Sequence, residues 1–227
     1  MKKHNGNIYG IFSIPTLMKY NIANEALLRT LCYNKSLNVG YLSKINLETN
    51  VSIYHQISNI YQLLKLDLTT QQDILTQTIE TINILSQNPK YTMINPSFSQ
   101  ILPRLKNNIS HIILSNSYDY KISKNICASF ETQGFECNML LHDNQNEFTQ
   151  ITQKYQITQK DIIFKVCDNI QEIKQIQNTQ IIPIGYAYDH INKDNLYKNG
   201  AYYVFGTYNM LPNIILTEKN NFYQSNV

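Results

Sequence analysis

The sequence predicts an α/β protein: a Rossmann-like parallel sheet with helices on both faces, and a helical cap inserted after the first strand. Short uninterrupted runs rich in Ile, Leu and Val indicate strands that are covered on both faces. Helical patterns separate the later runs, as in sheets whose parallel strands are joined by right-handed crossovers. Between the first run and the second, about 75 residues show the apolar spacing of amphipathic helices.

Each expected element rests on a local signal. The first strand covers residues 7–12 and is ended by Pro15. The next segment is helical, with Thr69 or Thr70 as the N-cap of one helix and an apolar stripe at 57, 60, 61 and 64 in another. A helix then begins near Pro96, and Pro103 is expected to kink it or end it early.

The remaining strands are expected at residues 111–114, 137–141, 162–166, 181–184 and 202–205, with helices between them. This order divides the chain into two domains. Residues 1–19 and 92–227 form the α/β core, and residues 20–91 form the helical cap.

Composition excludes several classes of protein. The chain has 227 residues and is 43% hydrophobic, which excludes wholesale disorder. No run approaches the roughly 18 apolar residues of a membrane-spanning helix, so no membrane association is expected. The first twenty residues contain neither an apolar signal core nor a cleavage site. The four cysteines form no CxxC pair, which argues against structural zinc and favours reduced thiols in the cytoplasm.

Charge and aromatic content do not indicate a nucleic-acid partner. The formal net charge is only +3, and the Lys and Arg residues form no basic run. The 17 tyrosines are scattered, which is typical of core and rim positions rather than of base-stacking platforms.

Two groups of polar residues follow predicted strands, where a parallel sheet places its functional site. Ser115 and Asn116 come directly after one strand, and their hydroxyl and backbone amides could hold a phosphoryl oxygen. Asp168 and Glu172 follow another strand and open a helix, so both could reach one Mg²⁺ ion. Taken alone, each group is explained better by ordinary helix capping or by compensation of the helix macrodipole.

The order of these features resembles the haloacid dehalogenase-like (HAD) superfamily, chiefly its phosphatases with a small helical cap. The resemblance runs from about residue 8 to residue 211. The segment 112–117, Ile-Ile-Leu-Ser-Asn-Ser, is similar to the second motif, in which Ser or Thr binds the phosphoryl group. The segment 163–168 with Glu172 is similar to the fourth motif, which supplies Mg²⁺-binding acids, although Cys167 stands where the family usually has Gly.

The first and third motifs depart from the family pattern. The family reads Asp-x-Asp-Gly-Thr-Leu, whereas an alignment on Thr16 and Leu17 places Phe12 and Ile14 at the two aspartates, and no Asp occurs before Asp67. His142, Asp143 and Asn144 stand where the resemblance implies a lysine. The next lysine downstream, Lys154, falls on a predicted helix and is expected to be a solvated surface residue.

These departures determine the expected function. In the family, the first aspartate attacks phosphorus and the second acts as general acid and base. Phe12 supplies no such group, and Ser13, the only nearby hydroxyl, should point away from Phe12 and Ile14 in a strand.

We therefore expect a catalytically inactive HAD-like module that binds a small phosphorylated ligand or a protein partner. The alternative is a hydrolase with Ser13, Ser115 or His142 as a displaced nucleophile and Mg²⁺ at Asp168 and Glu172. Apart from that possible Mg²⁺, no cofactor is expected.

Overall fold

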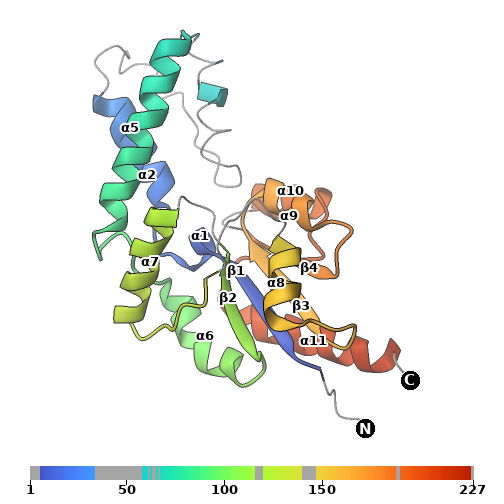
Figure 1. Ribbon diagram of the computed structural model, residues 1–227. Helices are drawn as coiled ribbons and strands as arrows, with labels where there is room; N and C mark the ends of the chain where they lie inside the picture. The colour runs from blue at the N-terminus through green and yellow to red at the C-terminus, as the bar shows by residue number, and fades with distance from the viewer. Residues whose placement is uncertain are drawn as a thin grey trace.

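A computed structural model describes residues 6–33, 58–60, 62, 65, 67–115, 120–139, 147–187 and 190–225. Its centre is one parallel sheet with the strand order β2-β1-β3-β4-β5 (Figure 1). The strands are β1 (Ile8–Ser13), β2 (His111–Ser115), β3 (Ile162–Cys167), β4 (Ile181–Tyr186) and β5 (Tyr203–Phe205). The predicted α/β class and parallel sheet are confirmed.

Helices cover both faces of this sheet. They are α6 (Pro96–Lys106), α7 (Tyr120–Thr132), α8 (Glu147–Tyr155), α9 (Ile170–Ile176), α10 (His190–Lys198) and α11 (Leu211–Ser225), with the short α1 (Ile14–Leu17) and η1 (Tyr208–Met210). On one face, Phe12 and Phe164 belong to a large cluster that includes Phe98 of α6. On the other face, Ile11 and Ile163 pack with residues of α8 and α9. The alternation along β1 and β3 therefore divides their side chains between two cores.

A glycine in β1 makes room for two aromatic rings. Phe12 and Phe164 pack edge to face with their ring centres 6.0 Å apart. A Cβ atom on Gly10 would lie 2.8 Å from Cζ of Phe164 and 3.0 Å from Cε2 of Phe12. Gly10 is therefore required by the packing on this face of the sheet.

Two long helices, α2 (Ile22–Tyr33) and α5 (Leu68–Ser86), follow β1 in the sequence and precede the other strands. These two helices pack against each other. Figure 1 shows them extending away from the sheet, beyond the end of β1 that leads into α1. Their near ends are not separate from the main core, because Ala26 and Ile82 belong to the same hydrophobic cluster as Phe12.

The chain leaves and re-enters the sheet region at adjacent points. Met18 and Ile94 form an antiparallel bridge, and the backbone N–H of Lys19 donates to the carbonyl oxygen of Met93 at 2.9 Å. The two connections to α2 and from α5 therefore run side by side.

The helix starting signals differ in one detail from the sequence prediction. The N-cap of α5 is Asp67 rather than Thr69 or Thr70, since its Oδ1 atom accepts a hydrogen bond from the backbone N–H of Thr70 at 2.8 Å. Aspartate is as good an N-cap as threonine, and its position two residues earlier lets α5 begin at Leu68.

The prediction that Pro103 ends or kinks its helix early was wrong about the end, because α6 continues to Lys106. Proline removes the hydrogen bond to the carbonyl of Ser99, four residues earlier. Both Pro103 and Ser99 lie on the exposed side of α6, where water can satisfy that carbonyl.

The strand predicted at residues 137–141 does not form within the described residues 137–139. Only Met139 makes a bridge there, parallel to Leu114, and the backbone N–H of Leu114 donates to the carbonyl of Asn138 at 2.8 Å. The thiol of Cys137 instead lies 3.6 Å from the carbonyl oxygen of Cys127 in α7. Residues 140 and 141 lie outside the described residues.

The predicted apolar stripe at residues 57, 60, 61 and 64 falls mostly outside the described residues. Ile60 is buried and helical, whereas Ile57, Tyr61 and Leu64, the other positions of the predicted stripe, lie outside the described residues. Throughout the part of the chain that the structure describes, no helix has the length and apolar character needed to cross a membrane.

Candidate functional site

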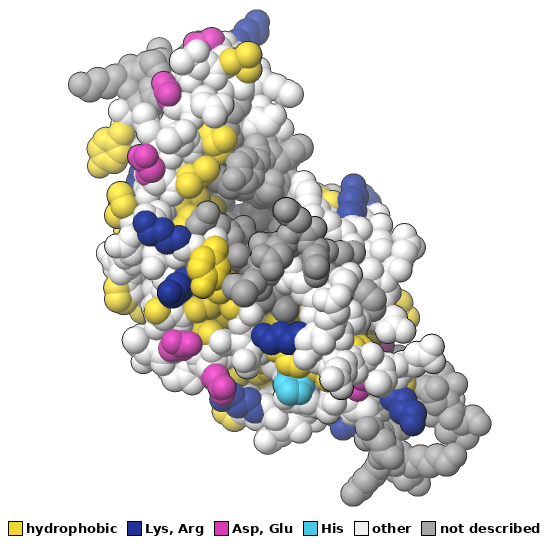
Figure 2. All heavy atoms as spheres, in the orientation of Figure 1, with side chains coloured by type: hydrophobic (Ala, Val, Ile, Leu, Met, Phe, Trp, Pro, Cys, Tyr) yellow, Lys and Arg dark blue, Asp and Glu magenta, His cyan; other side chains and the backbone are white. Residues whose placement is uncertain are grey.

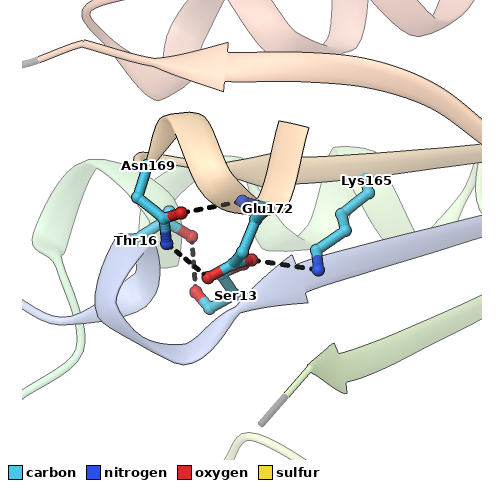
Figure 3. Close-up of polar contacts among 5 residues, drawn as sticks. All are labelled: Ser13, Thr16, Lys165, Asn169 and Glu172. Atoms are coloured by element: carbon cyan, nitrogen blue, oxygen red, sulfur yellow. Dashed lines mark hydrogen bonds and ion pairs between the residues drawn. The ribbon is translucent and has the colours of Figure 1, made fainter. Parts of the chain in front are cut away.

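Glu172 is the centre of a polar cluster at the carboxyl end of the sheet. It lies in the first turn of α9, and its carboxylate contacts three side chains from β1, β3 and the start of its own helix (Figure 3). The hydroxyl of Ser13 donates to Oε2, the ammonium of Lys165 lies 3.0 Å from the same Oε2, and Nδ2 of Asn169 donates to Oε1 at 2.6 Å. Both carboxylate oxygens are therefore engaged.

The fold places each of these groups by a simple local rule. Asn169 is the N-cap of α9, because its Oδ1 accepts from the backbone N–H of Glu172 at 2.8 Å. A second hydrogen bond, from Nδ2 of Asn169 to Oε1 of Glu172 at 2.6 Å, joins the two side chains and restrains the rotamer of Glu172. Ser13 is held from the other side, since its carbonyl oxygen accepts from the hydroxyl of Thr16 at 2.7 Å.

Lys165 is the residue that sequence reasoning missed. It lies within β3, opposite Ile11 of β1, and its side chain is only 3% exposed. A buried ammonium requires a partner, and Glu172 supplies the negative charge. The signal was present in the sequence: a lysine in a fully buried strand, two residues before the strand end, must meet a counter-charge on one face of the sheet.

Phe12 and Ile14 lie in the hydrophobic core and not in this polar cluster. Both are fully buried, and Phe12 packs edge to face with Phe98 and Phe164. The side chain of β1 that faces Glu172 belongs to Ser13, the last residue of the strand. As strand alternation predicts, Phe12 and Ser13 turn to opposite faces of the sheet.

Asp168 is buried near two tyrosines. It is 3% exposed, and its negative charge acts on Tyr186 and Tyr208, which stack with their ring centres 5.0 Å apart. Burial raises the pKa of both phenols, and the charge of Asp168 raises them further. The hydroxyl of Tyr208 donates to the carbonyl of Thr16 at 2.7 Å.

The other predicted site residues are placed as follows. Ser115 ends β2, is 2% exposed and lies beside Ser13 in register. Lys154 is exposed in the last turn of α8, with its ammonium 5.4 Å from the ring centre of Tyr155, so it is a surface lysine as predicted. Asn116 and residues 142–144, which include His142, lie outside the described residues.

The described residues do not fit a Mg²⁺ ion at Asp168 and Glu172. Magnesium needs carboxylate oxygens that are free to coordinate it at about 2.0–2.1 Å in octahedral geometry. Both carboxylate oxygens of Glu172 already accept hydrogen bonds, and the ammonium of Lys165 lies against Oε2. Across the described ranges, no group of three or more His, Cys, Asp or Glu side chains is arranged to hold a metal ion.

The comparison with solved structures identifies the fold. A phosphonoacetaldehyde hydrolase-like protein from Oleispira antarctica matches with a TM-score of 0.66 and 9% identity, covering 99% of this chain and 98% of that one. A haloacid dehalogenase-like family hydrolase from Streptococcus pneumoniae matches with a TM-score of 0.63 and 10% identity, covering 93% and 98%. The chain has the haloacid dehalogenase-like fold. A predicted phosphatase from Clostridium acetobutylicum is a third HAD-like neighbour, with a TM-score of 0.65, 15% identity and coverage of 94% and 100%.

Sequence comparison adds nothing to this likeness: no protein-family profile matches the chain, and no curated protein is significantly similar to it. The HAD-like resemblance deduced from the order of strand ends is thus confirmed by structure. At 9–15% identity these neighbours establish the fold and leave the chemistry to the residues of this chain.

Proposed function

We propose that this HAD-like protein has lost aspartyl phosphatase chemistry and acts as a binding or interaction module. One observation carries the proposal. The β1 side chain that faces Glu172 is the hydroxyl of Ser13, and no carboxylate is available from β1, which reads Ile-Tyr-Gly-Ile-Phe-Ser.

The chemistry requires more than this site offers. Aspartyl catalysis needs a carboxylate nucleophile that forms an acyl-phosphate, and a second group that protonates the leaving oxygen. Phe12 and Ile14 supply neither group, and both are fully buried in the core. The burial of Ser13 and Ser115 also supports an inactive site, because each is at most 2% exposed.

We propose that residues 20–91 act as the cap of the module and that residues 1–19 and 92–227 form its core. The pairing of α2 with α5 supports this division, although their near ends share the main hydrophobic cluster. A small phosphorylated ligand is the first choice of partner, since structural neighbours include a predicted phosphatase and a β-phosphoglucomutase.

A protein partner is the second choice. Leu28 of α2 and Ile84 of α5 are 41% and 65% exposed, and Figure 2 shows hydrophobic side chains on the part of this face that α2 and α5 form. Positive and negative side chains are interspersed over the same face, which supports the expectation that nucleic acid is not the partner. All four cysteines are free thiols, in keeping with a cytoplasmic location.

Phosphate release tests the loss of catalysis. Purified protein and the Asp168→Ala variant are incubated with Mg²⁺ and a panel of small phosphate esters. Both proteins should release phosphate no faster than buffer, while a shift in thermal unfolding identifies any ester that binds. Turnover that Asp168→Ala abolishes would overturn the proposal.

A displaced nucleophile is the second candidate function, and one contact favours it. The hydroxyl of Ser13 donates to the carboxylate of Glu172, which is how a general base would hold a serine nucleophile. Ser115 shows no such contact among the described residues, His142 lies outside them, and the contacts of Glu172 do not support the Mg²⁺ version. Mass spectrometry after incubation with the same esters tests this candidate: phosphate trapped on Ser13 would establish it, and unmodified Ser13 would leave the inactive module.

A further inference from the structure

We infer that the ammonium of Lys165 takes the place of the divalent cation in this site, so that the protein carries its own fixed positive charge and binds no Mg²⁺ there. This inference rests on the proposed function and concerns the same residues. It assigns to Lys165 the electrostatic task of neutralising Glu172 at the carboxyl end of the sheet.

Geometry is the first argument. The Nζ atom of Lys165 lies 3.0 Å from Oε2 of Glu172, and both side chains are largely withdrawn from water, at 3% and 12% exposed. At that separation a divalent ion coordinated by Oε2 would be pressed against an ammonium of the same sign. Repulsion in a poorly hydrated site is strong, so the two cations exclude each other.

The position of Lys165 within β3 is the second argument. Lys165 enters from the middle of β3, where its register partner is Ile11, and its neighbours in β3 on the same face are Ile163 and Cys167. The aliphatic stem therefore starts between apolar neighbours, and the terminal ammonium reaches Glu172 in the polar cluster. A fixed position inside a strand makes this charge a permanent part of the sheet.

The hydrogen-bond donors around Glu172 are the third argument. Ser13 donates to Oε2 and Asn169 donates to Oε1, so the carboxylate is surrounded by hydrogen-bond donors. A metal site offers acceptors to a cation, whereas this site offers donors to an anion. The described surroundings of Glu172 thus match a carboxylate neutralised from within the protein.

The experiment measures Mn²⁺ binding by electron paramagnetic resonance, with Mn²⁺ as a stand-in for Mg²⁺. The wild type should give the spectrum of free Mn²⁺ at all concentrations. Lys165→Met, which keeps the stem and removes the charge, should gain saturable binding, and the double variant Lys165→Met with Glu172→Gln should lose it again. Lys154→Met, at an exposed lysine, is the matched control and should behave as the wild type.

Two results would overturn the inference: saturable Mn²⁺ binding by the wild type that Glu172→Gln abolishes, or no gain of binding by a folded Lys165→Met. Should Lys165→Met fail to fold, thermal unfolding provides the second test. The double variant, which removes both charges, should then unfold at a higher temperature than Glu172→Gln, and an equal or lower temperature contradicts the pairing.

These outcomes are separable from the proposed function. Metal binding without turnover of phosphate esters defeats the inference and leaves the inactive module standing. Turnover in the presence of a chelator defeats the inactive module and leaves the role of Lys165 intact.

Discussion

Glu172 shows how one side chain can join distant parts of the chain. Its contact with Ser13 spans 159 positions in sequence and ties the end of β1 to the start of α9. The same carboxylate forms an ion pair with Lys165, so the cluster combines one ion pair with hydrogen bonds that hold its geometry. Charged hydrogen bonds of this kind are among the stronger polar interactions in a protein.

Replacing Ser13 with alanine tests this cluster. The variant removes one donor to a buried carboxylate, so we expect the free energy of unfolding to fall by about 1 to 3 kcal/mol. Urea denaturation measures the loss. Ser99→Ala, at an exposed position of α6, should change stability by no more than about 0.5 kcal/mol. Equal effects of the two variants would contradict a structural role for the Ser13 hydroxyl.

At this scale the sequence indicated some members of the cluster and not others. Glu172 and Asp168 stood out because acids followed a strand, and the alternation of β1 correctly placed Ser13 opposite Phe12. Lys165 was overlooked because the family pattern directed attention to residues 142–144. Its partner lies in the next element, and the reach of a long side chain cannot be deduced from spacing alone.

Among the secondary-structure elements, β1 has the least freedom to accept larger side chains. All six of its residues are buried, and it pairs with β2 on one side and β3 on the other. At Gly10, the rings of Phe12 and Phe164 lie close to the backbone of β1.

Gly10→Ala should therefore destabilise the sheet. The added Cβ would lie 2.8 Å from a carbon of the Phe164 ring, which is closed in by the core and has little room to move. We expect a loss of about 1 to 3 kcal/mol in the free energy of unfolding, measured by urea denaturation. Gly206→Ala is the control, since among the described residues its Cβ would meet only the carbonyl of Ala187, at 3.4 Å. A stability equal to that of the wild type would show that the rings shift freely.

The cap of α5 gives a prediction about acid. The pKa of Asp67 is lowered by the hydrogen bonds it accepts from the backbone N–H and hydroxyl of Thr70. A pKa lower in the folded than in the unfolded chain adds stability above the unfolded value, and this is lost as the pH falls through the folded value. Asp67→Asn keeps an acceptor but does not titrate, so its thermal unfolding should depend less steeply on pH below about 4.

The matched variant for that measurement is Gln72→Ala, at an exposed position of the same helix beyond the cap. It removes no ionisable group, so it should leave the acid dependence of unfolding as in the wild type. An unchanged slope in Asp67→Asn would mean that the cap contributes nothing to acid stability.

The sequence predicted the strands better than the helices. Short apolar runs marked all five strands within one or two residues, because a strand buried on both faces has a distinctive composition. The helix α11 was not predicted, since Asn, Thr and Lys interrupt it. Its signal was the spacing of Leu211, Ile214 and Ile215, which pack against the core.

For the whole molecule, buried and half-buried tyrosines couple stability to alkaline pH. Burial is the main cause of the raised pKa values of Tyr9, Tyr155, Tyr186, Tyr203 and Tyr208. A raised pKa in the folded state contributes stability below the unfolded value of about 10, and this contribution is lost as the pH rises toward the folded value. The protein should therefore lose stability progressively in this alkaline range.

Tyr208→Phe isolates the most buried of these phenols. The variant loses the hydrogen bond to the carbonyl of Thr16, so it should be about 1 to 3 kcal/mol less stable at neutral pH. Its stability should also fall less steeply above about pH 10, because one ionisation is removed. Urea midpoints across the alkaline range measure both effects. Tyr33→Phe, at a residue 82% exposed, is the control and should leave the stability at neutral pH unchanged.

The bridge between Met18 and Ile94 has a consequence for how such a chain can change over time. Because the outgoing and returning connections pair there, the two ends of the segment 19–93 are held next to each other. An insertion or deletion inside that segment would change its length without separating these ends, provided that the core contacts of Ala26 and Ile82 are kept. The segment can therefore diverge in evolution while the ionic cluster at the end of β1 keeps its place.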